Sequence, residues 1–281
     1  MANLNAKCQK YPELQNPTSF FAHTKVDEKH KVIICVVPKA AGTSIHNMMH
    51  LTMTGELAPD PNHCGESCWE NAGVWPLSHY PAVERMKRIR DYHKIIVVRN
   101  PFERLVSCWN DKFRHRGASL HNRVHGFRLI DRIRKNYSEP IRNELKKEMT
   151  FKEFVMLIEN YELNDPQFHD DHWKPMHDIC QPCFMNYDYM VRVETLNRDA
   201  KHILEKLELD MANFPHFNSN RESISQLTKD LPIYNDLTDN LKNILQNYYK
   251  RDMDLFGYQW NNSTNLASCD NYDSSEGGTC C

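Results

Sequence analysis

Two segments of this chain place basic and hydroxyl-bearing residues directly after short apolar runs. The first reads Pro38-Lys-Ala-Ala-Gly-Thr-Ser44, and the second reads Arg99-Asn-Pro-Phe-Glu-Arg-Leu-Val-Ser107. Small residues let a backbone close around an anion, and the N–H groups at a helix start attract phosphate or sulfate. An arginine can meet such an anion with two parallel hydrogen bonds. We therefore expect the two turns to hold the two ends of one nucleotide.

Each segment also has an alternative without a ligand. Lys39 precedes the only glycine of its turn, so the segment is not the Gly-x-x-x-x-Gly-Lys-Ser/Thr loop of kinases. It can be an ordinary strand-to-helix turn. In the second segment, Arg99 can simply pair with Glu103, with Ser107 filling space. Outward-pointing N–H groups are expected at the start of the first helix, from Gly42, Thr43 and Ser44.

The elements that carry these residues follow from the apolar pattern. Short β-branched runs at 32–37 and 95–98 are typical of buried strands in a parallel sheet, and residues 189–193 are expected to form a third strand. Helices are expected from about Thr43, from Pro101, and over 81–92, 151–159, 196–207 and 237–251. Residues 1–30 are expected to be an irregular lead-in, residues 31–260 one α/β domain, and residues 261–281 a disordered tail.

The composition is that of an ordinary globular protein. The 281 residues include 35 Lys and Arg against 37 Asp and Glu, which argues against a general nucleic-acid binder. No run approaches the roughly 18 apolar residues that span a membrane, and no signal peptide is visible. Ten cysteines nevertheless favour a secretory protein. So do three glycosylation sequons, at Asn136, Asn261 and Asn262.

Together the two segments resemble the paired signature of sulfotransferases that use 3′-phosphoadenosine 5′-phosphosulfate (PAPS). More narrowly, the chain resembles the Golgi carbohydrate sulfotransferases that modify chondroitin, dermatan and the HNK-1 glycan. Three further stretches agree, namely His172-Trp-Lys-Pro with Cys180-Gln-Pro-Cys183, Tyr187 to Leu196, and Tyr248 to Tyr258. The resemblance covers about 31–258 and implies a three-layer sandwich with a central parallel sheet, the P-loop NTPase-like fold that sulfotransferases share.

The resemblance also implies roles for individual residues. The 5′-phosphosulfate of the donor is expected to bind at Lys39, Ala41, Gly42, Thr43 and Ser44. The 3′-phosphate is expected to bind Arg99 and Ser107. The chain departs from the usual carbohydrate pattern at Gly42-Thr43-Ser44, where Cys-Thr-Asn is common, and at Asn100, where Asp is usual.

Sulfuryl transfer resembles phosphoryl transfer, in which positioning and charge stabilisation do most of the work. Lys39 is expected to stabilise the charge on the bridging oxygen of the departing nucleotide. Histidine suits the general base near neutral pH, and His172 is the candidate, with His169 as the runner-up. The alternative for His172 is a structural hydrogen bond that holds its loop, and Glu194 is a candidate structural anchor of the third strand. The scheme requires no metal.

Two further groups of residues have more than one interpretation. The basic stretch 114–150 can bind an anionic glycan through Arg114, Arg116, Arg123 and Arg128, or be a solvated face. Trp173 or Trp109 can stack on a sugar ring, although Trp109 fits a core position better. Cys180 and Cys183 can be one half of a zinc site, with Cys64 and Cys68 as the candidate other half. They can also be a redox pair or form disulfides. Cys35 and Cys108 are expected to be buried and free.

These observations predict an enzyme that transfers the sulfuryl group of PAPS to a hydroxyl of a chondroitin-type, dermatan-type or related glycan. One alternative is a P-loop kinase or NTPase, and another is a glycan-binding relative whose active site has decayed. The expected partner is a glycan acceptor, with no nucleic acid and no membrane segment in this chain. The resemblance places the enzyme in the Golgi lumen, with the cytoplasm as the alternative.

Overall fold

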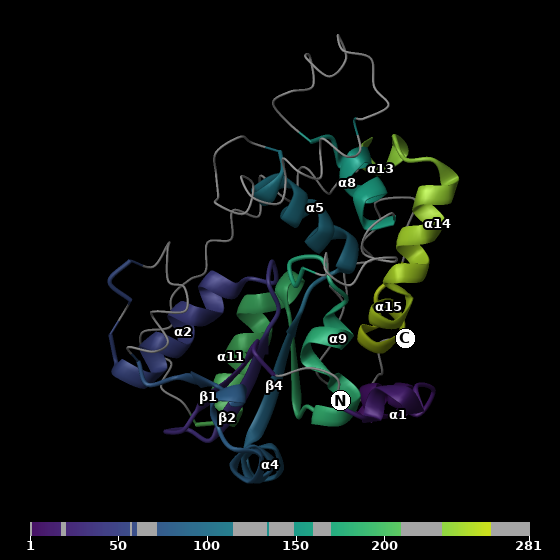
Figure 1. Ribbon diagram of the computed structural model, residues 1–281. Helices are drawn as coiled ribbons and strands as arrows, with labels where there is room; N and C mark the ends of the chain where they lie inside the picture. Colours follow the sequence, from purple (N-terminus) through teal and green to yellow (C-terminus); the bar gives the residue numbers. More distant parts are fainter. Residues whose placement is uncertain are drawn as a thin grey trace, which may run out of the picture.

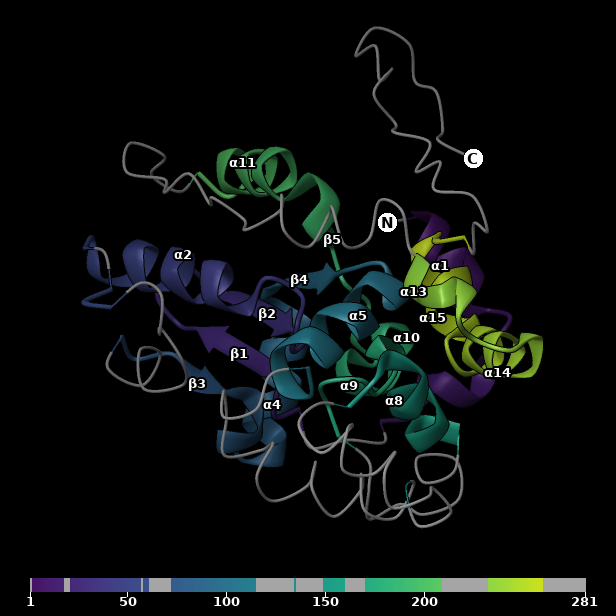
Figure 2. The same cartoon turned by 90° about the horizontal axis from the view of Figure 1, so that it is seen from above.

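The computed structural model describes residues 2–17, 21–56, 58–60, 72–114, 134, 149–159, 170–208 and 232–259. Within these ranges, five strands form one sheet in the order β3-β1-β2-β4-β5 (Figure 1 and Figure 2). They are β1 (Thr24–Asp27), β2 (Val32–Val36), β3 (Trp75–Pro76), β4 (His93–Val98) and β5 (Tyr189–Arg192).

The parallel half of the sheet is the part that the sequence predicts. Strands β2, β4 and β5 are parallel, with Ile34 opposite Ile95 and Val97 opposite Val191. All of β2, and β4 after its first residue, are buried, which explains their unbroken β-branched runs. The α/β class with a sheet between helices is confirmed.

The opposite edge of the sheet differs from the expectation. Strand β1 pairs antiparallel with β2, and β3 pairs antiparallel with β1, so the whole sheet is mixed. Residues 1–30 were expected to be irregular, which is wrong for α1 (Ala2–Cys8), a 3₁₀ helix at Pro12–Gln15, and β1. Strand β1 has the sequence Thr-Lys-Val-Asp, which is too polar and too short to show a strand pattern.

Helices cover both faces of the sheet (Figure 2). On one face lie α2 (Gly42–Thr54) and α11 (Leu196–Lys206). On the other side lie α4 (Ala82–Asp91), α5 (Pro101–Lys112), α9 (Met176–Cys180) and α10 (Pro182–Met185). Helices α4 and α11 begin and end close to the predicted positions, and α2 and α5 begin close to theirs. Helices α9 and α10 were not predicted, because residues 160–186 were expected to be irregular. Further 3₁₀ helices lie at Leu77–His79 and Val193–Thr195.

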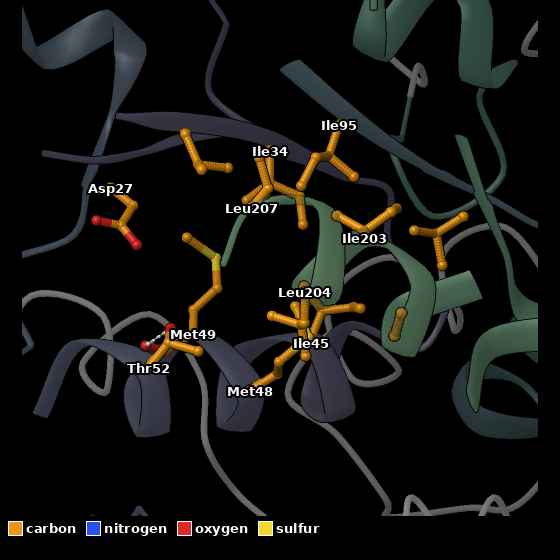
Figure 3. A pocket seen from close by; sticks show the side chains of 13 residues that line it. Asp27, Ile34, Ile45, Met48, Met49, Thr52, Ile95, Ile203, Leu204 and Leu207 are labelled. Atoms are coloured by element: carbon orange, nitrogen blue, oxygen red, sulfur yellow. Dashed lines mark hydrogen bonds between the residues drawn. The ribbon is translucent and has the colours of Figure 1, made fainter. Parts of the chain in front are cut away.

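A small pocket of about 30 Å³ remains between the sheet, α2 and α11 (Figure 3). Its lining is almost entirely apolar, with Ile34, Met48 and Leu204 among the side chains. The carboxylate of Asp27 also reaches this pocket, but it is already bonded to the ring of His30 at 2.7 Å. The pocket is therefore a packing gap in the core and offers no constellation of polar groups for chemistry.

A second, aromatic cluster joins α5 to α8 (Phe151–Leu157), α13 (Pro232–Asn235) and α14 (Asp239–Tyr248). The predicted last helix divides at Tyr249, where α15 (Lys250–Phe256) begins. Trp109 and Trp173 both belong to this cluster, at 8% and 3% exposure. Trp109 is a core residue as expected. The stacking of Trp173 on a sugar is a wrong expectation, because the cluster encloses its ring.

Two disulfides cross-link distant parts of the chain, Cys8 to Cys183 and Cys35 to Cys180. The expectation that Cys35 is free is wrong, because the side chain of this β2 residue points to the face covered by α9. Cys108 is buried and free, as expected. In the described ranges no group of three His, Cys, Asp or Glu side chains is arranged to hold a metal ion. None of the described helices has the length and apolar character needed to cross a membrane.

Candidate active site

The loop between β2 and α2 turns sharply because two of its residues are left-handed. Lys39 has φ 68° and Ala41 has φ 56°, a region that costs a non-glycine residue about 1–2 kcal/mol. Ala41 is the N-cap of α2, and its side chain accepts no hydrogen bond. The first N–H that bonds within the helix is that of Ile45, to the carbonyl of Ala41. The helix start is thus an uncapped end with positive polarity, which suits an anion.

Gly42 itself does not shape this loop. A Cβ added there would lie 3.8 Å from the ring of His46 and from the side chain of Val36, which is ordinary contact. Its φ is not in the left-handed range. The sharpness of the turn therefore comes from Lys39 and Ala41 and not from the glycine.

The ammonium of Lys39 points across the loop to the end of α5. Its Nζ donates to Oδ2 of Asp111 at 3.1 Å, and the two side chains are 20% and 45% exposed. Burial alone would raise the pKa of Asp111, but the charges of Lys39 and Lys112 outweigh it and lower that pKa. The loop thus presents its cation at an accessible position next to a carboxylate.

Arg99 brings the second segment into contact with the first. It follows β4, which is the parallel neighbour of β2, so the carboxyl ends of both strands meet at one edge of the sheet. Its Nη1 donates to the backbone carbonyl of Lys39 at 3.0 Å, and Nη2 lies 3.6 Å from Glu103. Its buried Nε has no hydrogen-bond partner among the described residues. The ion pair of Arg99 with Glu103 is therefore present together with a contact to the loop of Lys39, and the binding of a 3′-phosphate by Arg99 stays a prediction.

Burial lowers the pKa of the Arg99 guanidinium, and the carboxylates of Glu103 and Glu194 oppose that effect. Arginine starts from such a high value that the group stays charged. A buried cation with an unsatisfied N–H is a place where an added anion gains both charge and a hydrogen bond. Ser107 lies on α5, which begins two residues after Arg99, and is only 5% exposed. Its predicted contact with the 3′-phosphate stays a prediction.

The residues next to Arg99 hold α5 in place. Asn100 is the N-cap of α5, and its side chain accepts hydrogen bonds from the N–H groups of Phe102 and Glu103. Asparagine caps a helix as well as aspartate does, which accounts for the departure from the usual Asp. Glu194 accepts from the N–H of Asn100 at 2.7 Å and from the hydroxyl of Tyr258 at 3.0 Å. These contacts make Glu194 the structural anchor that the sequence predicts.

His172 lies in the segment that precedes α9. Its Nδ1 is 2.7 Å from Oδ1 of Asp170, which also accepts the N–H of His172 at 2.8 Å. In the neutral ring, a carboxylate in contact with Nδ1 keeps the proton on that nitrogen and leaves the lone pair on Nε2, which is the tautomer that a general base needs. The side chain is 27% exposed. The runner-up, His169, lies outside the described residues.

Sequence reasoning missed Arg104, which connects the two segments. Its side chain, 1% exposed, donates to the carbonyls of Pro38, Asp171 and Lys174 at 2.9, 2.6 and 2.7 Å. The available signal was an arginine within the run Phe102 to Val106, whose other side chains are mostly apolar. The charged groups around Arg104 also affect the pKa of Cys108, one turn later on α5. Burial raises the pKa of its thiol to about 12, Lys39 and Arg104 lower it, and Asp170 and Asp111 raise it.

A second histidine, His23, was also missed. Its Nε2 lies 2.7 Å from Oδ2 of Asp171, and the hydrogen bond of this ring is the main reason that the pKa of Asp171 is lowered. The backbone carbonyl of His23 accepts the N–H of Val36 at the end of β2. No local pattern marks this histidine, because its partner lies in a distant part of the chain.

The site thus combines a cationic loop, an uncapped helix start and an arginine after the neighbouring strand. The sequence of the chain also matches a known protein family. Residues 22–259 match the model of the sulfotransferase family. The chain belongs to the sulfotransferase family. It is 30% identical to carbohydrate sulfotransferase 11 of Mus musculus over 241 residues, which cover 84% of this chain and 67% of that protein.

Two other relatives show similar levels of identity. Carbohydrate sulfotransferase 9 of Homo sapiens is 30% identical over 264 residues, covering 89% of this chain and 57% of that protein. Carbohydrate sulfotransferase 14 of Danio rerio is 30% identical over 243 residues, covering 86% and 64%. The chain thus spans about two thirds or less of the length of these relatives. No solved structure was found to match it. Because the chain belongs to the sulfotransferase family, it uses a sulfate donor, and the kinase alternative is not supported.

Proposed function

We propose that this sulfotransferase transfers the sulfuryl group of PAPS to a hydroxyl group of a glycan. The single observation that carries the proposal is the contact between Arg99 and the backbone of Lys39 at 3.0 Å. It brings two anion-binding elements to one edge of the sheet, as a donor with phosphates at both ends of its nucleoside requires. The names of the relatives add the carbohydrate acceptor.

The residues present fit such a donor. The uncapped start of α2 offers N–H groups and the dipole of the helix, and Lys39 adds a positive charge for the 5′-phosphosulfate. At the other end, Arg99 offers a buried Nε without a partner among the described residues. The start of α2 consists of Ala41, Gly42, Thr43 and Ser44. At the other end of the donor, Ser107 completes the proposed 3′-phosphate site.

The transfer step follows from the charges in the site. The acceptor hydroxyl attacks sulfur, and its proton passes to Nε2 of His172, which Asp170 holds through Nδ1. The bond between sulfur and the bridging oxygen breaks in line with the attack. Lys39 stabilises the negative charge that collects on that oxygen, which leaves with the nucleotide.

The acceptor is proposed to be a chondroitin-type, dermatan-type or related glycan. Most of the basic stretch 114–150 lies outside the described residues, including Arg116, Arg123 and Arg128. Two of its arginines are engaged within the protein. Arg114 lies over the ring of Trp109 at 5.4 Å, and Arg134 forms a buried pair with Glu153 at 2.7 Å. Contacts of the stretch with a glycan are therefore proposed for residues before Arg134.

We place the enzyme in the lumen of the Golgi apparatus. Two disulfides, Cys8–Cys183 and Cys35–Cys180, favour an oxidising compartment over the cytoplasm. The second of them joins β2, which leads into the donor loop, to α9, which follows His172. An oxidising compartment would therefore support the geometry of the proposed site directly.

The proposal is tested by incubating the protein with radiolabelled PAPS and a panel of chondroitin, dermatan, heparan and unsulfated glycans. Disaccharide analysis then identifies the product. Label is expected in at least one glycan of the chondroitin or dermatan type. Binding of a glycan without transfer would favour the decayed relative. Stabilisation by ATP and magnesium, but not by adenosine 3′,5′-bisphosphate, in a thermal-shift assay would favour the kinase.

A further inference from the structure

Arg104 is the least exposed arginine among the described residues, and no described carboxylate forms an ion pair with it. All of its hydrogen bonds go to backbone carbonyls. Its Nε donates to Pro38, Nη2 to Asp171 and Nη1 to Lys174. Each of the first two acceptors directly precedes a proposed catalytic residue. Pro38 precedes Lys39, and Asp171 precedes His172.

A buried charge without an ionic partner is expensive, so its presence needs an explanation. Filling the core does not supply one, because the neighbouring Leu105 and Val106 are fully buried at no such cost. A planar guanidinium has five N–H groups in a fixed fork, which can reach three carbonyls in different directions. An ammonium on a flexible stem cannot hold three such acceptors in one rigid arrangement. Arg104 is therefore suited to fixing backbone positions.

We infer that Arg104 is a positioning residue for sulfuryl transfer. By holding the carbonyls of Pro38 and Asp171 on one guanidinium, it sets the distance between the loop of Lys39 and the segment of His172. This inference rests on the proposed function, since it takes Lys39 and His172 as the two groups that act on the transfer. Arg104 itself does not touch donor or acceptor.

The separation of binding from transfer makes the inference testable. A misplacement of about 1 Å between reacting groups costs roughly 100-fold in rate. The 3′-phosphate of the donor is proposed to bind Arg99, which hydrogen-bonds to the carbonyl of Lys39 and not to the three carbonyls that Arg104 holds. Loss of the fork therefore lowers kcat and leaves the affinity for the nucleotide product largely intact.

The test compares Arg104→Lys with the wild type in kcat, in KM for PAPS, and in calorimetric affinity for adenosine 3′,5′-bisphosphate. We expect kcat to fall roughly 100-fold, with product affinity changed by less than about threefold. The matched control is Arg88→Lys. Arg88 also joins two segments by a fork, to Glu28 at 2.6 Å and Glu84 at 2.8 Å, but it lies on α4, beyond the amino end of β4. This control is expected to keep the wild-type kcat.

An Arg104→Lys protein with wild-type kcat would overturn the inference, and so would an equal loss of kcat and product affinity. If the variant does not fold, hydrogen exchange of the wild type decides. Binding of adenosine 3′,5′-bisphosphate should then slow exchange in both 38–44 and 170–174, and slowing confined to 38–44 would refute the coupling. A wild type that transfers no sulfate to any glycan would refute the proposed function, and this inference with it.

Discussion

Replacement of Lys39 by alanine separates catalysis from stability most sharply. The Lys39–Asp111 pair is partly exposed to solvent, with side chains 20% and 45% exposed and a separation of 3.1 Å. Such pairs contribute about 0.2–1 kcal/mol to stability. The free energy of unfolding should therefore fall by less than about 1 kcal/mol. The lost stabilisation of the leaving oxygen is larger, about 2.7–4 kcal/mol, which is the effect of removing one donor from a preorganised site. This corresponds to a kcat lower by roughly 100- to 1,000-fold.

The assay is steady-state transfer of labelled sulfate, with denaturant unfolding measured on the same samples. The structure supplies a matched control, Lys112→Ala, because Lys112 pairs with the same Asp111 at 3.2 Å. This substitution removes an equal charge from beside the same carboxylate, but Lys112 lies on α5 and outside the donor loop. We expect Lys112→Ala to retain kcat within a few-fold. Equal losses in the two variants would show that general charge, and not the position of Lys39, carries the effect, and would refute the reasoning.

Two further predictions concern histidines. In a transfer assay His172→Ala should reduce kcat by at least about 100-fold. His23→Ala should keep most of the wild-type kcat, because His23 contacts Asp171 at the edge of the segment. A larger loss of kcat in His23→Ala than in His172→Ala would transfer the role of base to His23. Burial opposes protonation of His177, but its hydrogen bond with Asp252 raises the pKa above the ordinary 6.5. Its contribution to stability is therefore full below pH 6.5 and is lost as the pH rises through the higher pKa of the folded state. Chemical unfolding at several pH values should show this decline in the wild type and not in His177→Asn.

The parts of the fold that could be predicted are those with strong local patterns. Strands β2 and β4 contain β-branched runs because both of their faces are buried, whereas β5 is a shorter strand in which only Val191 is buried. The helices after β2 and β4 begin at small or proline-containing turns, which are equally local signals. Adjacency of parallel strands then brings their carboxyl ends together. This is why the contact between Arg99 and the loop of Lys39 could be expected from the sequence.

The parts that could not be predicted depend on contacts between distant residues. Strand β1 is recognisable only through its pairing with β2, since Val26 is its only apolar residue. Cys35 has the local setting of a buried free thiol, and only the position of α9 on the same face makes it half of a disulfide. Likewise Arg104 and His23 have partners far along the chain. No spacing within the sequence marks such residues.

The central claim is that the loop of Lys39 and the guanidinium of Arg99 hold opposite ends of one donor. Calorimetric titration of adenosine 3′,5′-bisphosphate and of adenosine 5′-monophosphate tests it most directly, because the two ligands differ only at the 3′ end. Charged hydrogen bonds of about 1.5–3 kcal/mol predict that the wild type binds the bisphosphate roughly 10- to 100-fold more tightly. Arg99→Gln should abolish that preference, whereas Lys39→Ala should leave the preference unchanged. Equal affinities of the wild type for both ligands, or a preference that survives Arg99→Gln, would contradict the account.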